Sequence, residues 1–152
     1  MGSAGNALSL EDERAIIDGT VRYCWAIDGR NWDELADVFT DDALVKFGVA
    51  APVRGLSEIQ SFIARVLTPL DASQHMVTNH RVERDDEGVR SRCYFQAQHV
   101  RRGVDGGANY IVAGIYRDVW SESPVGWRIR SRELEVLWTE GNVAVIGAPS
   151  RP

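Results

Sequence analysis

The stretch VRSRCYFQAQHV, residues 89–100, alternates between two kinds of side chain. One face carries the core-type positions and a histidine: Val89, Cys93, Phe95, Ala97 and His99. The other face carries Arg90, Arg92, Gln96 and Gln98. A period of two is typical of a strand with one face in the core and the other in water. The stretch therefore predicts a strand of a sheet that is covered on one side.

Three similar runs surround this stretch, so the second half of the chain has the character of a sheet. We expect strands over residues 73–85, 88–102, 108–121 and 126–140. The breaks between them read DDEG, GVDGG and ESPVG, which are rich in turn-forming residues and favour hairpins. The second half therefore predicts an antiparallel meander.

The first half of the chain carries helical patterns. Ser9 with Asp12 predicts a helix start, and apolar positions recur at helical spacing as far as Ile27. The segments WDELADVFT (32–40) and SEIQSFIARVLTPL (57–70) predict two more helices, and DDALVKFG (41–48) predicts a strand between them. The order predicts an α+β fold, in which a curved antiparallel sheet is packed with three N-terminal helices.

Length and composition limit the possible classes of protein. The 152 residues are sufficient for one domain, which we expect over residues 9–140, between a flexible N-terminal tail (1–8) and a C-terminal tail (141–152). A net charge of −5 argues against a nucleic-acid partner. No apolar run approaches the roughly 20 residues that span a membrane, and no secretory signal is visible, so a cytoplasmic location is expected. Cys24 and Cys93 lie in apolar patterns and are expected to be buried free thiols.

Several segments resemble the SnoaL-like branch of the nuclear transport factor 2-like superfamily, which includes scytalone dehydratase and the lindane dehydrochlorinase. They are YCWAIDGRNWDELADVFTDDA (23–43), GLSEIQSFI (55–63), QHMVTNHRVE (74–83), GIYRDVW (114–120) with GWRIRSREL (126–134), and LWTEGN (137–142). The resemblance covers residues 9–140. It implies a cone-shaped α+β barrel whose helices close a hydrophobic pocket, and a homo-oligomer, either a dimer or a trimer.

Asp28 and His75 are the leading candidates for chemistry. An aspartate at a helix C-terminus is unfavourable by roughly 0.3–1 kcal/mol, so Asp28 is either a turn-capping carboxylate or a functional one. The resemblance implies the second, because Asp28 and His75 match the family's catalytic aspartate–histidine pair. An imidazole changes its protonation near neutral pH, and a buried carboxylate on one ring nitrogen would determine its tautomer.

Three further residues are candidates for contact with a substrate. Tyr23 stands where the dehydrochlorinase has a lysine, and its phenol could donate a hydrogen bond; the alternative is a packed tyrosine. Arg132 matches a pocket arginine of the dehydrochlorinase pattern and would stabilise a developing anion. His99 shares the core face of its strand and resembles a second histidine of scytalone dehydratase; the alternative is a structural histidine. Asp118 lies on the strand where SnoaL-type cyclases keep a catalytic aspartate, but the sequence does not determine the register of that strand.

His80 follows His75 by five positions, so alternation predicts that it lies on the opposite, outer face. The three histidines lack metal-ligand spacing, and we expect neither a metal nor a cofactor.

The leading hypothesis is a cofactor-independent lyase of dehydratase type, or an isomerase, that acts on a small hydrophobic cyclic molecule in an internal pocket. His75, oriented by Asp28, would remove a proton next to an activating group. The first alternative is a SnoaL-like polyketide cyclase that promotes an intramolecular aldol closure. The second is a non-catalytic module for small-molecule binding or assembly.

Overall fold

One curved sheet of six strands is the frame of the computed structural model, which describes residues 7–147. The strands are β1 (Phe39–Phe47), β2 (Val53–Arg54), β3 (Ala72–Asp85), β4 (Gly88–Val100), β5 (Asn109–Ser123) and β6 (Gly126–Gly141). They lie in the order β2-β1-β6-β5-β4-β3, and only β1 and β6 are parallel neighbours. The predicted meander is confirmed as β3–β6, whereas the short strand β2 was not expected.

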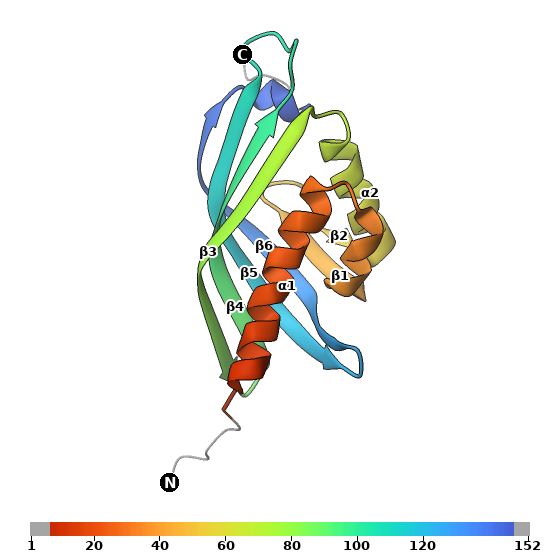
Figure 1. The fold of residues 1–152 in the computed structure, drawn as a ribbon, viewed down its shortest axis with the longest axis vertical. Helices are drawn as coiled ribbons and strands as arrows, with labels where there is room; N and C mark the ends of the chain where they lie inside the picture. Colours follow the sequence, from red (N-terminus) through yellow and green to blue (C-terminus); the bar gives the residue numbers. More distant parts are fainter. Residues whose placement is uncertain (1–6, 148–152) are drawn as a thin grey trace.

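The helices α1 (Leu10–Asp28), η1 (Trp32–Asp37, a 3-10 helix) and α2 (Leu56–Leu67) gather on one side of the sheet (Figure 1). The α+β prediction is confirmed, with an unclosed sheet. Ser9 caps α1 as expected, because its hydroxyl accepts a hydrogen bond from the Asp12 backbone N–H at 3.0 Å. The helix predicted from residue 57 is α2, which begins one residue earlier, at Leu56, with Gly55 at its N-cap.

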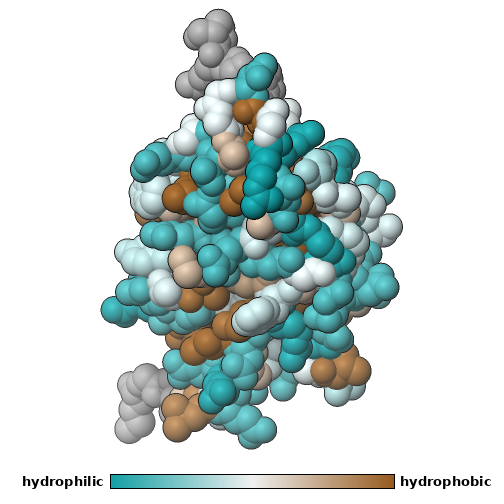
Figure 2. Space-filling view, turned by 45° about the horizontal axis from the view of Figure 1, so that its top comes forward, coloured by the Kyte–Doolittle hydropathy of each residue, from teal (hydrophilic) through white to brown (hydrophobic). Residues whose placement is uncertain are grey.

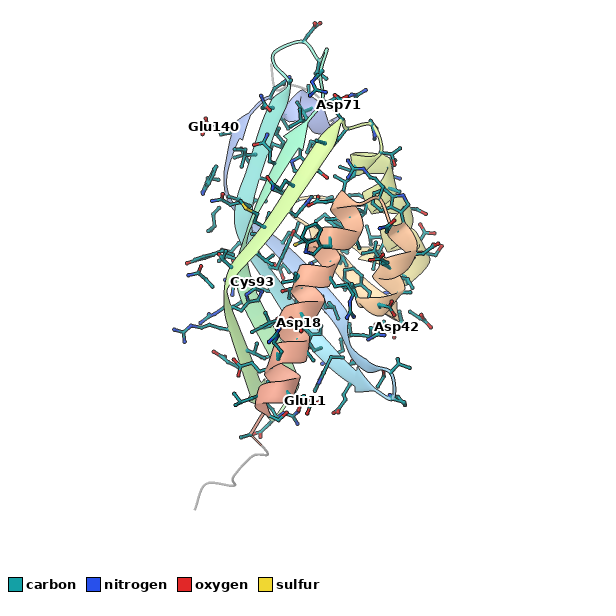
Figure 3. All side chains as sticks on the ribbon, in the orientation of Figure 1. Glu11, Asp18, Asp42, Asp71, Cys93 and Glu140 are labelled. Atoms are coloured by element: carbon teal, nitrogen blue, oxygen red, sulfur yellow. The ribbon has the colours of Figure 1, made fainter. Side chains whose placement is uncertain are left out.

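Burial along β4 follows the alternation on which the sheet was predicted. Cys93, Phe95 and Ala97 are buried, while Arg92 and Gln96 on the opposite face are exposed. The acidic residues labelled in Figure 3 (Glu11, Asp18, Asp42, Asp71 and Glu140) are all exposed. Figure 2 shows a largely hydrophilic face with scattered hydrophobic groups. Among the described residues, no helix is long and apolar enough to cross a membrane.

The C-terminal stretch, expected as a tail from residue 141, begins with ordered structure. Residues Val143–Ile146 form a second 3-10 helix, η2, and Val145 is fully buried in the core. Leu8, in the expected N-terminal tail, packs partly against the core. Residues 1–6 and 148–152 of the two predicted tails lie outside the described residues.

Candidate active site

A cavity of about 520 Å³ lies between the sheet and the helices. Its walls come from α1, α2, the end of β1 and the loop after it, the strands β3–β6 and the end of η2. Most lining side chains are apolar; the polar ones are Tyr23, His75, His99, Tyr110, Tyr116 and Thr139. Among the described residues that line it, none is Asp, Glu, Lys or Arg. A cavity with such walls favours an uncharged, mostly apolar ligand.

Asp28 and His75 meet at the edge of this cavity. Asp28 is the last residue of α1, and His75 lies on β3, 47 residues further along the chain. Nδ1 of His75 lies 2.7 Å from Oδ1 of Asp28, and the backbone N–H of His75 donates to Oδ2 at 2.7 Å. The side chain of His75 is only 7% exposed. The structure therefore brings together the two residues that the resemblance paired.

The hydrogen bonds of this pair determine the tautomer of His75. An ionised carboxylate can only accept hydrogen bonds, so Nδ1 of His75 carries a proton and Nε2 of the neutral ring is free as a base. Burial alone would raise the pKa of Asp28. The hydrogen bonds and charge of His75, together with the Ser73 hydroxyl, outweigh burial and hold that pKa below its usual value. The carboxylate is therefore ionised at neutral pH.

Two residues that hold Asp28 were missed in the sequence. The Ser73 hydroxyl donates to Oδ1 of Asp28 at 2.9 Å, and Arg30 donates to the Ser73 oxygen at 2.8 Å. Ser73 precedes His75 by two positions on β3, so strand alternation could have placed it on the same face. Arg30 gave no comparable signal, because its contact depends on how the chain turns after α1.

His99 lies beside His75 in the cavity wall. The two rings meet edge to face with their centroids 5.7 Å apart. Nδ1 of His99 lies 3.2 Å from the Tyr110 carbonyl oxygen, so Nδ1 is protonated and Nε2 of the neutral ring is an acceptor. Burial, aided by the charge of His75, lowers the pKa of His99 to about 4. His99 is therefore neutral at pH 7 and accepts hydrogen bonds in the cavity.

The lowered pKa of His99 makes a prediction for stability. Between pH 6.5, the ordinary value, and about 4, the unfolded chain binds a proton at this residue and the folded chain does not. The contribution of His99 to the free energy of unfolding is thus fully present above pH 6.5. It falls as the pH is lowered toward 4, by up to about 3 kcal/mol. Urea unfolding across this range should show a flatter pH dependence in His99→Gln than in the wild type. An unchanged slope would contradict the assignment.

Arg132 lies behind the cavity wall, and it is not among the described lining residues. Its Nε and Nη2 donate to the two carboxylate oxygens of Asp118 at 2.7 and 2.8 Å, and both side chains are fully buried. Its guanidinium carbon lies 4.4 Å from the ring centre of Tyr23 and 4.1 Å from that of Tyr116. A direct contact between Arg132 and a substrate, as the sequence suggested, therefore has no support in this geometry.

Tyr23 and Tyr116 stand between this ion pair and the cavity. Burial raises the pKa of Tyr23 to about 12, against the opposing charge of Arg132, and raises that of Tyr116 well above its usual value. Both phenols therefore stay protonated. The Tyr23 oxygen accepts a hydrogen bond from the Arg132 side chain, which can only donate, so the phenol proton itself is not used by this contact. The two phenols are thus donors available to a ligand.

The family is shown by sequence comparison. The family model described as "SnoaL-like domain" matches residues 8–133. The chain belongs to the SnoaL-like domain family. The uncharacterized protein Rv2910c of Mycobacterium tuberculosis is 30% identical over 125 residues, which are 81% of each chain. The terrestric acid biosynthesis cluster protein E of Penicillium crustosum is 27% identical over 145 residues, which are 91% of this chain and 92% of that protein.

Several solved structures share the fold of this SnoaL-like chain. Kfla4162 of Kribbella flavida has a TM-score of 0.83 at 24% identity, over 91% of this chain and 98% of that chain. A scytalone dehydratase-like protein of Novosphingobium aromaticivorans has a TM-score of 0.78 at 22% identity, over 88% and 89%. A hexachlorocyclohexane dehydrochlorinase, LinA type 2, has a TM-score of 0.77 at 20% identity, over 92% and 95%. At these identities, the likeness shows a common fold.

His80 of this SnoaL-like domain does not lie on the outer face, so that prediction was wrong. Asn79 takes a left-handed backbone conformation (φ 57°), and the pairing of β3 with β4 shifts between Thr78 and Arg81. The extra residue of this bulge returns His80 to the inner side. There its Nε2 lies 2.7 Å from the Thr20 hydroxyl of α1, away from the lining of the cavity.

Other reactive side chains in the SnoaL-like domain are buried or dispersed. Within residues 7–147, no group of three or more His, Cys, Asp or Glu side chains is arranged to hold a metal ion. Cys24 and Cys93 are buried free thiols, and burial raises the pKa of each to about 12 despite the nearby charge of Arg132. Neither thiol is a thiolate nucleophile at neutral pH.

Proposed function

We propose that this protein is a cofactor-independent lyase of dehydratase type, in which Asp28 and His75 move a proton on a small, uncharged ring ketone. One observation carries the proposal. The ring of His75 is held by Asp28 on one nitrogen at 2.7 Å, while the same ring lines a hydrophobic cavity. A histidine held in this way presents a free Nε2 to whatever the cavity contains.

The distribution of hydrogen-bonding groups supports a hydroxylated ketone as the substrate. Tyr23 and Tyr116 can donate to a carbonyl oxygen, and their protons would stabilise the enolate that forms when the neighbouring carbon loses a proton. His99 offers an acceptor nitrogen to a hydroxyl group. The apolar walls between these polar groups suit a ring skeleton, and the lack of charged lining residues in the described cavity disfavours carboxylates and phosphates.

The proposed reaction is an elimination of water from a β-hydroxyketone. Nε2 of His75 takes the proton from the carbon next to the carbonyl, and the C–H electron pair forms an enolate. The enolate then collapses to a C=C bond as the C–O bond to the hydroxyl breaks. The imidazolium of His75 returns its proton to the leaving hydroxide, which departs as water. His99 is neutral and bonded to the Tyr110 carbonyl, so it orients the hydroxyl and does not supply this proton.

The comparisons support the general class. The chain belongs to the SnoaL-like family, and its structural neighbours include a scytalone dehydratase-like protein and dehydrochlorinases, which favours lyase-type or cyclase chemistry without a cofactor. A cyclase would use the same base, since an aldol closure also begins with an enolate. An isomerase would return the proton to a different carbon.

The dehydratase proposal is tested with a panel of synthetic ring ketones. We expect the protein to convert β-hydroxycyclohexanone, or its alkyl-substituted analogues, to the conjugated enone, which is followed by its ultraviolet absorbance. The α-hydroxy isomer is the matched control and should not react. Elimination requires the hydroxyl on the carbon next to the one that loses the proton, and in this isomer the carbonyl carbon stands between the two. Equal rates with and without the protein for every β-hydroxyketone would refute dehydration.

A further inference from the structure

The turn that follows α1 contains a residue in an unfavourable backbone conformation. Arg30 has φ 60°, in the left-handed region that helix ends usually reserve for glycine. A residue with a side chain loses about 1–2 kcal/mol in this conformation. Gly29, which could adopt it freely, stands one position earlier and has φ −79°. The side chain of Arg30 should therefore make contacts in this turn that a glycine could not make.

Arg30 uses its side chain to connect the end of α1 to β3. Its Nη1 donates to the Ile27 carbonyl oxygen at 2.9 Å and to the Ser73 hydroxyl oxygen at 2.8 Å. The last turn of α1 contains no basic residue, and its final residue is the acidic Asp28. The guanidinium thus places a positive charge where the helix dipole and Asp28 are both negative.

The bond from Arg30 determines the direction in which the Ser73 hydroxyl donates. A serine oxygen has one proton to give and two lone pairs. Since Arg30 occupies a lone pair, the proton is directed to Oδ1 of Asp28, 2.9 Å away. Oδ1 then accepts from Ser73 and from Nδ1 of His75, while Oδ2 accepts from the His75 backbone. These three bonds leave the carboxylate a single orientation.

We propose that Arg30 and Ser73 are positioning residues that act in series, with Arg30 orienting the Ser73 hydroxyl and Ser73 holding the Asp28 carboxylate against His75. The inference rests on the proposed function, which gives the Asp28–His75 pair its role, and it concerns how the two side chains keep their relative orientation. Besides Arg30, the charged or titratable groups around Asp28 are His75 and His99 on the sheet and Cys24 on α1. Cys24 stays a neutral thiol, so Ser73 and Arg30 are the partners of the Asp28 carboxylate that substitution can test.

The test reads the His75 ring directly by nitrogen-15 NMR of the full-length protein, without any substrate. In the neutral ring of the wild type we expect a protonated Nδ1 and an unprotonated Nε2. Ser73→Ala removes one donor from the carboxylate, so protonation of Asp28 on acidification should begin at higher pH, and the change in the Nδ1–H signal that accompanies it should come at higher pH as well. Ser73→Thr keeps the hydroxyl and should restore the wild-type titration. Gln74→Ala, an exposed neighbour on the same strand, is the matched control and should change nothing.

The serial arrangement makes a second, stricter demand. Arg30→Gly removes the guanidinium and suits the left-handed backbone, so the fold should be kept. It should move the titration in the same direction as Ser73→Ala, but its effect should be smaller once Ser73 is alanine, when only the charge of the guanidinium is lost. Additive shifts, or an Arg30→Gly titration equal to the wild type, would overturn the proposal. Because no turnover is measured, this result is independent of whether the pair performs the proposed dehydration.

Discussion

Replacing His75 with alanine is expected to lower the turnover of a ring β-hydroxyketone by at least roughly 100-fold. The substitution removes the only lining nitrogen that is both free to accept a proton and backed by a carboxylate among the described residues. Asp28→Asn should have an effect of similar size for a different reason. An asparagine can turn its NH₂ toward Nδ1 of His75, which then becomes the acceptor, so that the proton moves to Nε2 and blocks the base.

The measurement is kcat and KM for the wild type and both variants, with melting temperatures to confirm folding. His80→Gln is the histidine control, since His80 lies on the same strand but outside the cavity lining, and it should turn over close to the wild-type rate. A loss confined to KM, or near-wild-type turnover in either Asp28→Asn or His75→Ala, would remove the pair from the mechanism.

Replacing Arg132 with methionine is expected to lower the free energy of unfolding by about 3–5 kcal/mol. The substitution leaves the Asp118 carboxylate fully buried without the guanidinium that now holds both of its oxygens. Two aromatic contacts, with Tyr23 and Tyr116, are lost as well. A change of this size is a large part of the roughly 5–15 kcal/mol that stabilises a typical domain.

Urea unfolding measures this effect, and two variants make it specific. In Arg132→Met with Asp118→Leu, neither charge is buried, so most of the stability should return. Arg117→Met breaks the exposed pair of Arg117 with Glu135, in which the side chains are 46% and 44% exposed, and should cost less than about 1 kcal/mol. If Arg132→Met were as mild as Arg117→Met, the buried pair would not be a structural element.

The fold could be predicted from local patterns wherever the period of the pattern was unbroken. The alternation at residues 89–100 became β4, and the turn-rich breaks became the hairpins of the meander. The pattern failed where a bulge changed the register. Asn79 turned His80 to the inner face, and the shift between Val119 and Trp120 determines that Asp118 faces Arg132. Alternation alone does not show where an extra residue is inserted.

The site was less accessible to prediction than the fold. Nothing in local spacing joins Asp28 to His75 across 47 positions, and the pairing came from the family resemblance. The position of Arg132 behind two tyrosines depends on how α1 packs on β5 and β6, which local patterns do not show. Arg30 is the clearest example of this limit, since its role arises from a backbone conformation that its residue type disfavours.

Deuterium exchange tests directly whether Asp28 and His75 remove a proton beside a carbonyl. Cyclohexanone and α-tetralone are first shown to bind the cavity by their effect on the resonances of lining residues. Each is then incubated with the protein in deuterium oxide, and deuterium next to the carbonyl is measured by mass spectrometry. If the pair removes this proton, exchange should be rapid with the wild type and close to the buffer rate with His75→Ala and Asp28→Asn. Equal exchange by the wild type and His75→Ala, or no exchange of a bound ketone by the wild type, would contradict it.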